Sequence, residues 1–216
     1  TASLPDDLDD LKGLAEMGLE ENTILIFTSD NGGIRSISTQ EPLRAGKGSY
    51  YEGGIRVPCT IKWPGTNMAG KIIGEPISNL DFFPTFMELL NVDMPNYRSD
   101  GQNLMPLLKG GTMGERPLFW HFPIYLEAYD PKMDDGRDPM FRTRPGSVVM
   151  QGDWKLHYYY EDNEIELYNL RDDLGERNNL NTSNPSKAKE LLNLLKVWLN
   201  ETGAPIPKVP NPDYDS

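Results

Sequence analysis

Residues 22–33 read Asn-Thr-Ile-Leu-Ile-Phe-Thr-Ser-Asp-Asn-Gly-Gly. The apolar and β-branched run at 23–29 is typical of a strand that is buried on both faces of a sheet. A helix is predicted before it, because apolar residues recur at mostly helical spacings over residues 6–19. In an open α/β sheet, ligands bind beyond the carboxyl ends of strands. This layout makes Asp30 and Asn31 the first candidates for a functional site.

Up to residue 113 the sequence predicts one more strand and one more helix. The strand covers residues 57–63, and the helix covers residues 82–90 with Pro84 in its first turn. With the elements before them, they predict part of an α/β sheet core at residues 1–113.

After residue 113 the pattern changes to aromatic-rich runs separated by polar loops. These runs predict a small antiparallel sheet with strands at 117–123, 146–151, 153–160 and 165–170. A final helix is expected to begin at Asn184-Pro185, with Asn184 as its N-cap, and to pack against that sheet. The predicted fold class is therefore α/β: a sheet-core piece, then a C-terminal subdomain of antiparallel sheet and packed helix at residues 114–216.

The composition indicates a folded globular protein and excludes several classes. Of the 216 residues, 38% are hydrophobic and 25% charged, and the net charge is −12. This acidic balance argues against binding to nucleic acid or anionic membranes, and no apolar run approaches the roughly 18 residues of a membrane span. A single cysteine, Cys59, and two histidines exclude a disulfide framework and a zinc site built from such residues within the chain. Because Thr1 replaces an initiator methionine, we expect a fragment.

Asp30 and Asn31 offer three side-chain oxygens at the end of a predicted strand. Hard cations such as Ca²⁺ prefer oxygen ligands, although two residues cannot fill a calcium shell of about 6 to 8 oxygens. The alternative is an ordinary Asx-turn, because Asp-Asn-Gly is common turn chemistry.

A second candidate site lies in residues 42–58, where Lys47 has a glycine on each side. Such flanks let the ammonium group approach an anion closely. The region from residue 30 to residue 62 holds five cations and only three acids, so it is a basic island in an acidic chain. It is not a P-loop, because that motif would require glycine at Glu41 and Ser or Thr at Gly48. A flexible glycine loop with a solvated lysine is the alternative.

Five blocks of this sequence resemble the type I sulfatase family in order and spacing. They are residues 22–33, Leu-Arg-Ala-Gly-Lys-Gly at 43–48, Tyr-Glu-Gly-Gly-Ile-Arg-Val-Pro at 51–58, Trp-Pro-Gly at 63–65 and Asp-Phe-Phe-Pro-Thr at 81–85. Later blocks at 152–156, 166–170 and 176–180 resemble the family's C-terminal subdomain. The likeness covers almost the whole chain, and it implies a sulfatase-type sheet core, of the alkaline-phosphatase-like superfamily, that hydrolyses sulfate esters.

The resemblance also implies roles for individual residues. Asp30 and Asn31 match the family's second pair of ligands to one divalent cation, usually Ca²⁺, and Lys47 matches the lysine that contacts the sulfate. Glu52 and Arg56 are expected to fix the glycine loop between them, with anion contact by Arg56 as the alternative.

The family's nucleophile is a formylglycine made from Cys or Ser in a Cys/Ser-x-Pro-x-Arg motif, which this chain does not contain. Cys59 is followed by Ile61 and Trp63 where the motif requires Pro and Arg, and we expect it to be a small buried residue. The formylglycine, the first aspartate pair of the metal site and a central histidine are expected in a missing N-terminal part. The fragment alone is expected to be inactive.

Four further residues are candidates for substrate binding: His121, Arg142, Arg144 and Arg35. The resemblance places the segment around His121 near the active-site mouth, with core packing as the alternative. Arg142 and Arg144 are able to bind an anionic group through bidentate contacts, with a solvated loop as the alternative, and Arg35 is weighed in the same way.

The implied substrate is a sulfate-ester small molecule or a sulfated glycan, and the implied location is periplasmic or secreted. Two other functions remain open. One is a phosphatase or phosphodiesterase of the same superfamily, whose two-zinc members rely on additional Asp and His ligands. The other is a non-catalytic module that retains the sulfatase architecture.

Overall fold

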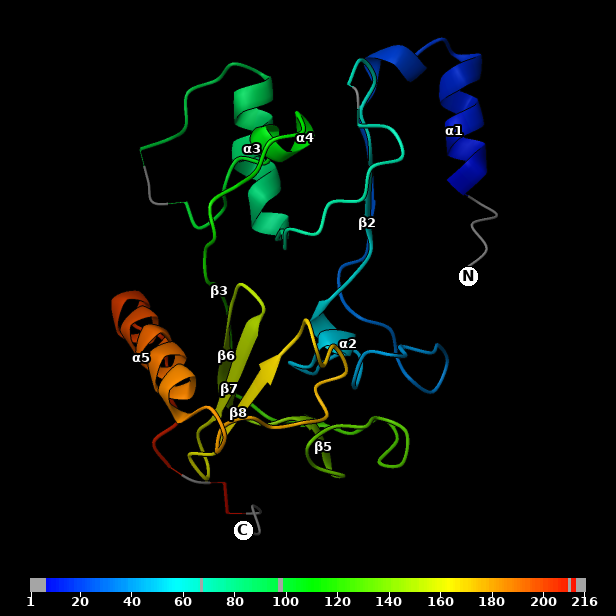
Figure 1. The fold of residues 1–216 in the computed structure, drawn as a ribbon. Coiled ribbons are helices and arrows are strands. Elements are labelled where there is room, and N and C mark those ends of the chain that lie inside the picture. Colours follow the sequence, from blue (N-terminus) through cyan, green and yellow to red (C-terminus); the bar gives the residue numbers. More distant parts are fainter. Residues whose placement is uncertain (1–6, 67, 97–98, 210, 213–216) are drawn as a thin grey trace. The chain divides into compact units, whose positions relative to one another are not determined.

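The computed structural model describes residues 7–66, 68–96, 99–209 and 211–212 (Figure 1). The chain divides into two compact units, one of residues up to 27 with 59–114, the other of residues 28–58 with 115–216. The first unit ends at residue 114, one residue after the predicted domain boundary between residues 113 and 114. Residues 28–58, which the sequence assigned to the core piece, belong to the C-terminal unit. The domain division itself stays a prediction.

The part of the chain before residue 114 carries short helices and two strands. In chain order these are α1 (Asp7–Glu16), η1 (Glu20–Asn22), β1 (Leu25–Thr28), α2 (Glu52–Ile55), β2 (Cys59–Lys62), η2 (Asn79–Asp81), α3 (Phe82–Leu89) and α4 (Met105–Leu108). The predicted first helix ends three residues early, and its predicted start at Asp6 lies outside the described residues. None of the helices in the described ranges is long and apolar enough to cross a membrane.

The predicted burial of the first strand on both faces is wrong for this chain. Leu25 and Ile26 are only partly buried, and the Phe27 side chain is 42% exposed. The reason is that β1 pairs with β2 in a two-stranded sheet, which is too small to bury both faces. Cys59, the first residue of β2, is exposed for the same reason rather than buried as predicted.

The second unit is built on the predicted antiparallel sheet. Its strand order is β3-β6-β7-β8, with bounds Leu118–Phe122, Gly146–Gln151, Trp154–Tyr159 and Ile165–Asn169. Each neighbouring pair is antiparallel, and the register places Leu156 of β7 between Val149 of β6 and Leu167 of β8. Two short strands, β4 (Leu126–Glu127) and β5 (Phe141–Thr143), pair separately. The predicted sheet is therefore confirmed.

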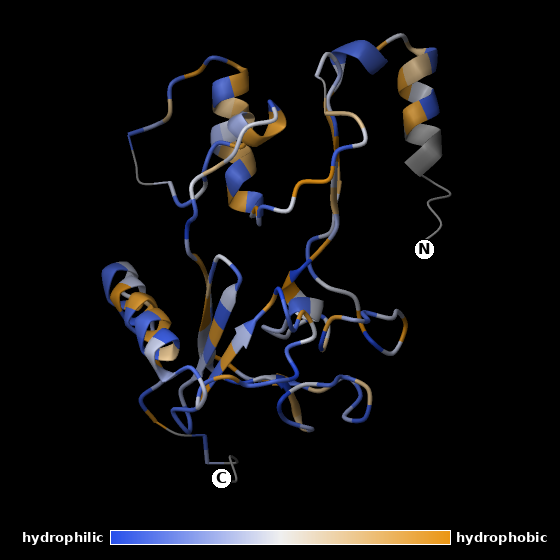
Figure 2. Ribbon diagram, in the orientation of Figure 1, coloured by the Kyte–Doolittle hydropathy of each residue, from blue (hydrophilic) through white to orange (hydrophobic). Residues whose placement is uncertain are grey.

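The helix α5 (Pro185–Thr202) covers one face of this sheet, as predicted. Ala188, Leu191, Leu195 and Leu199 recur at helical spacing and form one buried cluster with Val149, Leu156 and Leu167. Figure 2 shows the resulting mixture of hydrophobic and hydrophilic positions along the helix. Asn184 occupies the N-cap position, as predicted, although its side chain makes no capping hydrogen bond.

The opposite face of the sheet carries polar residues that are equally buried. Successive side chains of a strand point to opposite faces, so Lys155, His157 and Tyr159 point away from α5. Lys155 and His157 are fully buried and Tyr159 is 4% exposed. They contact Tyr50, Tyr51 and Glu52, so the segment leading into α2 covers this second face. This packing explains why residues 28–58 belong to the second unit.

Candidate functional site

Backbone hydrogen bonds join the turn that holds Asp30 and Asn31 to the loop that holds Lys47. The N–H of Gly32 donates to the carbonyl of Gly54 (2.9 Å), and the N–H of Lys47 donates to the carbonyl of Gly33 (3.0 Å). A third bond runs from the N–H of Gly53 to the carbonyl of Arg44 (2.8 Å). We call residues 32–33, 44–47 and 53–54 the glycine junction. It brings the two sequence-predicted sites together.

The glycine junction forms because its glycines have no side chains. A β-carbon on Gly32 would lie 1.7 Å from the carbonyl oxygen of Gly53, and one on Gly53 would lie 2.3 Å from the carbonyl oxygen of Ala45. Both neighbours are backbone atoms, which cannot rotate away. Ala45 itself is buried with a φ of 56°, an uncommon conformation for a residue with a side chain. The close approach of three backbone segments therefore explains why positions 32 and 53 are glycines.

Asp30 and Asn31 lie at the accessible end of this arrangement. The amide Nδ2 of Asn31 donates to Oδ1 of Asp30 (2.6 Å), and the hydroxyl of Ser29 donates to the carbonyl of Asn31 (2.9 Å). Asp30 is exposed and Asn31 is half-buried. Among the residues that the structure describes, no group of three or more His, Cys, Asp or Glu side chains could hold a metal ion. The pair therefore offers part of a coordination shell.

Lys47 lines a shallow surface hollow, which opens to solvent and has room for roughly one water molecule. Its lining residues are Ile34, Arg35, Gly46, Lys47, Ser49, Tyr129, Asp134 and Arg142. Three of these carry a positive charge and one a negative charge. The single acid, Asp134, accepts hydrogen bonds from the backbone N–H groups of Tyr129 (2.6 Å) and Asp130 (3.1 Å). Positive charges therefore outnumber negative ones among the lining residues, and Asp135 offsets part of this excess through its ion pair with Arg35 (3.8 Å).

The two arginines of the hollow are oriented by backbone carbonyls. Arg142 donates from Nε to the carbonyl of Glu127 (2.7 Å) and from Nη1 to the carbonyl of Lys47 (3.2 Å). Its guanidinium carbon lies 3.5 Å from the centre of the Tyr129 ring, a cation–π contact. Arg35 donates from Nε to the carbonyl of Met133 (2.7 Å). The structure therefore brings Arg35 and Arg142 beside Lys47, and their contact with substrate stays a prediction.

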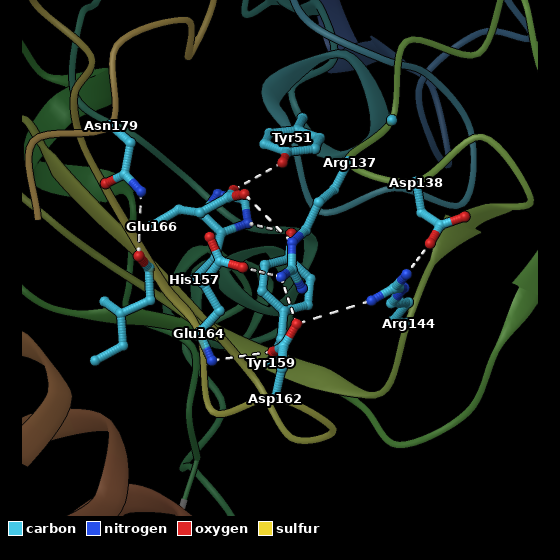
Figure 3. A network of polar contacts seen from close by, with 12 residues as sticks. Tyr51, Arg137, Asp138, Arg144, His157, Tyr159, Asp162, Glu164, Glu166 and Asn179 are labelled. Atoms are coloured by element: carbon cyan, nitrogen blue, oxygen red, sulfur yellow. Dashed lines mark hydrogen bonds and ion pairs between the residues drawn. The ribbon is translucent and has the colours of Figure 1, made fainter. Parts of the chain in front are cut away.

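His121 and Arg144 do not line this hollow. Both ring nitrogens of His121 have partners within the chain: Nδ1 lies 2.8 Å from the Ser147 hydroxyl, and Nε2 lies 3.1 Å from the carbonyl of Pro205. Burial lowers the pKa of His121, and the bond to Pro205 only partly opposes that shift. Arg144 forms an ion pair with Asp138 (Figure 3). Their predicted contact with substrate stays a prediction, and packing explains their present contacts.

A buried charged cluster beneath α2 went unrecognised in the sequence. The ammonium of Lys155 lies 2.8 Å from Oε1 of Glu52 and 3.0 Å from Oε1 of Glu176. Nε2 of His157 also lies 3.0 Å from that Glu176 oxygen. The other Glu52 oxygen lies 3.3 Å from Arg56, which confirms the predicted pairing of these two residues around the glycine loop. One signal was available: Lys155 and His157 alternate with Leu156 in a strand whose apolar face is evident.

Burial and neighbouring charges act in opposite directions on the pKa of Glu176. Burial by itself raises the pKa of Glu176, because it disfavours the charged form. The charge of Lys155, the hydrogen bond from His157 and the N–H of Glu52 outweigh burial and lower that pKa to about 2. Glu176 is therefore an anion at neutral pH, although it is fully buried.

With this geometry in place, comparison with known proteins settles the family. The model of the family "N-sulphoglucosamine sulphohydrolase, C-terminal" matches residues 46–204. The chain belongs to the sulfatase family. This sulfatase chain is 35% identical to a sulfatase of Formosa agariphila over 92% of its own length, and 30% identical to human steryl-sulfatase over the same share. It covers 38% of each of these two relatives.

Solved structures confirm the sulfatase fold. The structure of Ps i-CgsB in complex with k-i-k-neocarrahexaose matches with a TM-score of 0.70 and 27% identity, covering 87% of this chain and 39% of that one. BT4656, solved with its substrate D-glucosamine-2-N,6-O-disulfate, matches with a TM-score of 0.68 and 24% identity, covering 93% and 39%. The sheet and α5 thus belong to the C-terminal portion of a sulfatase fold.

Proposed function

We propose that the complete gene product hydrolyses sulfate esters, and that this chain supplies two metal ligands and a sulfate-binding lysine to its active site. The glycine junction carries this proposal, because it holds the Asp30–Asn31 turn beside the Lys47 loop in a member of the sulfatase family. A turn and a solvated loop with unrelated roles would not require three backbone segments to approach so closely.

Asp30 and Asn31 are proposed to bind one Ca²⁺ ion. These side chains offer the oxygen atoms that a hard cation prefers, because the carboxylate has two oxygens and the amide has one. Asn31 turns its Nδ2 towards Asp30, which leaves the amide oxygen available to a ligand. Since Ca²⁺ takes about 6 to 8 oxygens, the remaining ligands are expected outside this chain. A bound cation would supply charge stabilisation and orientation at the sulfate group.

Lys47 is proposed to bind a sulfate oxygen. Its backbone bond to Gly33 fixes the position of its main chain beside the Asp30–Asn31 turn. Its ammonium group would stabilise the negative charge that grows as the sulfate ester breaks. The formylglycine nucleophile that the family uses is not encoded in this chain, and no described residue takes its place in the proposal.

The substrate class that fits best is a sulfated glycan, with smaller sulfate esters as the other candidates. Arg35 and Arg142 add two cations beside Lys47, which suits a substrate with more than one anionic group. Support also comes from Ps i-CgsB, which was solved with the saccharide k-i-k-neocarrahexaose. His121 and Arg144 are kept as secondary candidates for contacts further along such a chain.

Turnover of an aryl sulfate and of the matching aryl phosphate by the complete gene product tests the proposal. We expect preference for the sulfate, and Lys47→Ala should lower kcat by about 10²- to 10³-fold, as removal of a charge-stabilising donor does in other enzymes. The control is Lys189→Ala, which removes an exposed cation from α5. Preference for phosphate would favour a phosphatase, and no turnover of either ester would favour a non-catalytic module.

A periplasmic or secreted location is proposed from the same family relationship. Cell fractionation followed by immunoblotting of the complete gene product tests it, and recovery in the cytoplasmic fraction alone would contradict it.

A further inference from the structure

The helix α2 is held at its first residue by the buried charged cluster. The N–H of Glu52 donates to Oε2 of Glu176 (2.6 Å), and the Glu52 carboxylate accepts from Lys155 (2.8 Å). Glu52 is 3% exposed, and the other two residues are fully buried. Both the backbone and the side chain of Glu52 are therefore tied to residues of the sheet subdomain, more than a hundred positions away in the sequence.

The rest of α2 has little with which to anchor itself. It is four residues long and reads Glu-Gly-Gly-Ile, so its two central positions have no side chains. Those same two glycines hold the glycine junction, since Gly53 donates to Arg44 and Gly54 accepts from Gly32. The place of α2 therefore depends on its first residue and on Tyr51, whose hydroxyl donates to Glu166 (2.7 Å) on the same face of the sheet (Figure 3).

We propose that Glu176, with Lys155, is a positioning residue for the proposed active site: it fixes α2 and, through the glycine junction, the place of Lys47 relative to Asp30 and Asn31. The site's role in sulfate hydrolysis rests on the proposed function, whereas the mechanical link does not. In this arrangement the C-terminal sheet subdomain is a part of the active-site framework, because two of its buried charges set the geometry of a loop in the preceding sequence.

Glu176 acts through charge and acceptor geometry rather than through volume. Its two oxygens accept from three donors: Lys155 and His157 on Oε1, and the N–H of Glu52 on Oε2. Glutamine has nearly the same shape, but one of its two terminal atoms is an NH₂ group. In Glu176→Gln that NH₂ must face either the Glu52 N–H or the pair formed by Lys155 and His157, so at least one donor loses its acceptor. A small misplacement of a catalytic group is enough to lower a rate by orders of magnitude.

Hydrogen–deuterium exchange of the complete gene product tests the mechanical link without any assay of turnover. The amides of Gly32, Lys47 and Gly53 donate the three bonds of the glycine junction. In Glu176→Gln we expect exchange in peptides covering residues 30–56 to rise at least tenfold. Peptides covering β3 and β6 should change by less than twofold.

The matched control is Leu195→Ala, which destabilises the same unit from the opposite face of the sheet. At temperatures chosen to give both variants the same margin below their Tm, this control should leave exchange in residues 30–56 near the wild-type value. Equal exchange in the two variants, or no rise in Glu176→Gln, would overturn the proposal. If Glu176→Gln does not fold, Glu176→Asp provides the same comparison. Aspartate keeps the negative charge, but its shorter side chain places the carboxylate further from α2.

Turnover then separates this proposal from the proposed function. If the wild type hydrolyses an aryl sulfate, Glu176→Gln should lower kcat/KM at least tenfold, while Leu195→Ala stays within twofold under the matched conditions. Equal losses in both variants would reject a positioning role. If the wild type hydrolyses no sulfate ester, the proposed function fails, and the exchange result still decides whether Glu176 fixes the glycine junction.

Discussion

The charge of Glu176 is expected to make the stability of the second unit depend on pH. Its pKa falls from 4.5 to about 2 on folding, a difference of about 2.5 pKa units. At about 1.4 kcal/mol per unit, ionised Glu176 contributes roughly 3 kcal/mol to the free energy of unfolding. Because the folded pKa is the lower one, this contribution is complete above pH 4.5 and is lost as the pH falls through about 2. Roughly 2 kcal/mol of it should be gone by about pH 3.

Urea denaturation followed by far-ultraviolet circular dichroism at several pH values between 7 and 2 measures this loss. The comparison is between wild type and Glu176→Gln, which has no carboxyl to titrate at this position. We expect the wild-type advantage in unfolding free energy to shrink by roughly 3 kcal/mol between pH 5 and pH 2. Glu190→Gln is the control, because the Glu190 side chain is 59% exposed on α5. An advantage of Glu176 that is the same at pH 7 and pH 2 would refute the reasoning.

Three further predictions concern packing and cofactor. Gly53→Ala places a methyl group 2.3 Å from the carbonyl oxygen of Ala45. It should therefore lower the free energy of unfolding by about 1–3 kcal/mol. An unchanged midpoint of urea denaturation would contradict this. Leu195→Ala, in the buried cluster of α5 and the sheet, should lower the free energy of unfolding by about 2–5 kcal/mol. Val197→Ala, at a 55% exposed position, should change it by less than about 0.5 kcal/mol in the same urea denaturation, and equal losses in the two variants would contradict this. Chelation of divalent cations should abolish sulfate turnover by the complete gene product, with recovery on addition of Ca²⁺; full activity in the chelator would argue against the cation at Asp30 and Asn31.

Local sequence patterns predicted the elements of the second unit well. The strands β6, β7 and β8 follow from β-branched and aromatic runs between polar loops, and α5 follows from a helical apolar pattern. Each of them lies close to its expected bounds. A pattern of this kind reports which side of an element is apolar, and that is a property of neighbouring residues. It fails where burial depends on distant partners, as with β1 and Cys59, which are more exposed than their apolar surroundings suggest.

The candidate site shows the same division. The sequence by itself determined which side chains Asp30, Asn31 and Lys47 offer, namely oxygen donors for a cation and an ammonium group between two glycines. Only the tertiary structure decided that these groups share one junction and that Arg35 and Arg142 join them while the other two candidates do not. It alone assigned Lys155 and Glu176 to the support of α2. The physical reason is that ion pairs and hydrogen bonds to backbone carbonyls join residues that are far apart in the sequence. The local spacing of apolar residues does not indicate such pairings.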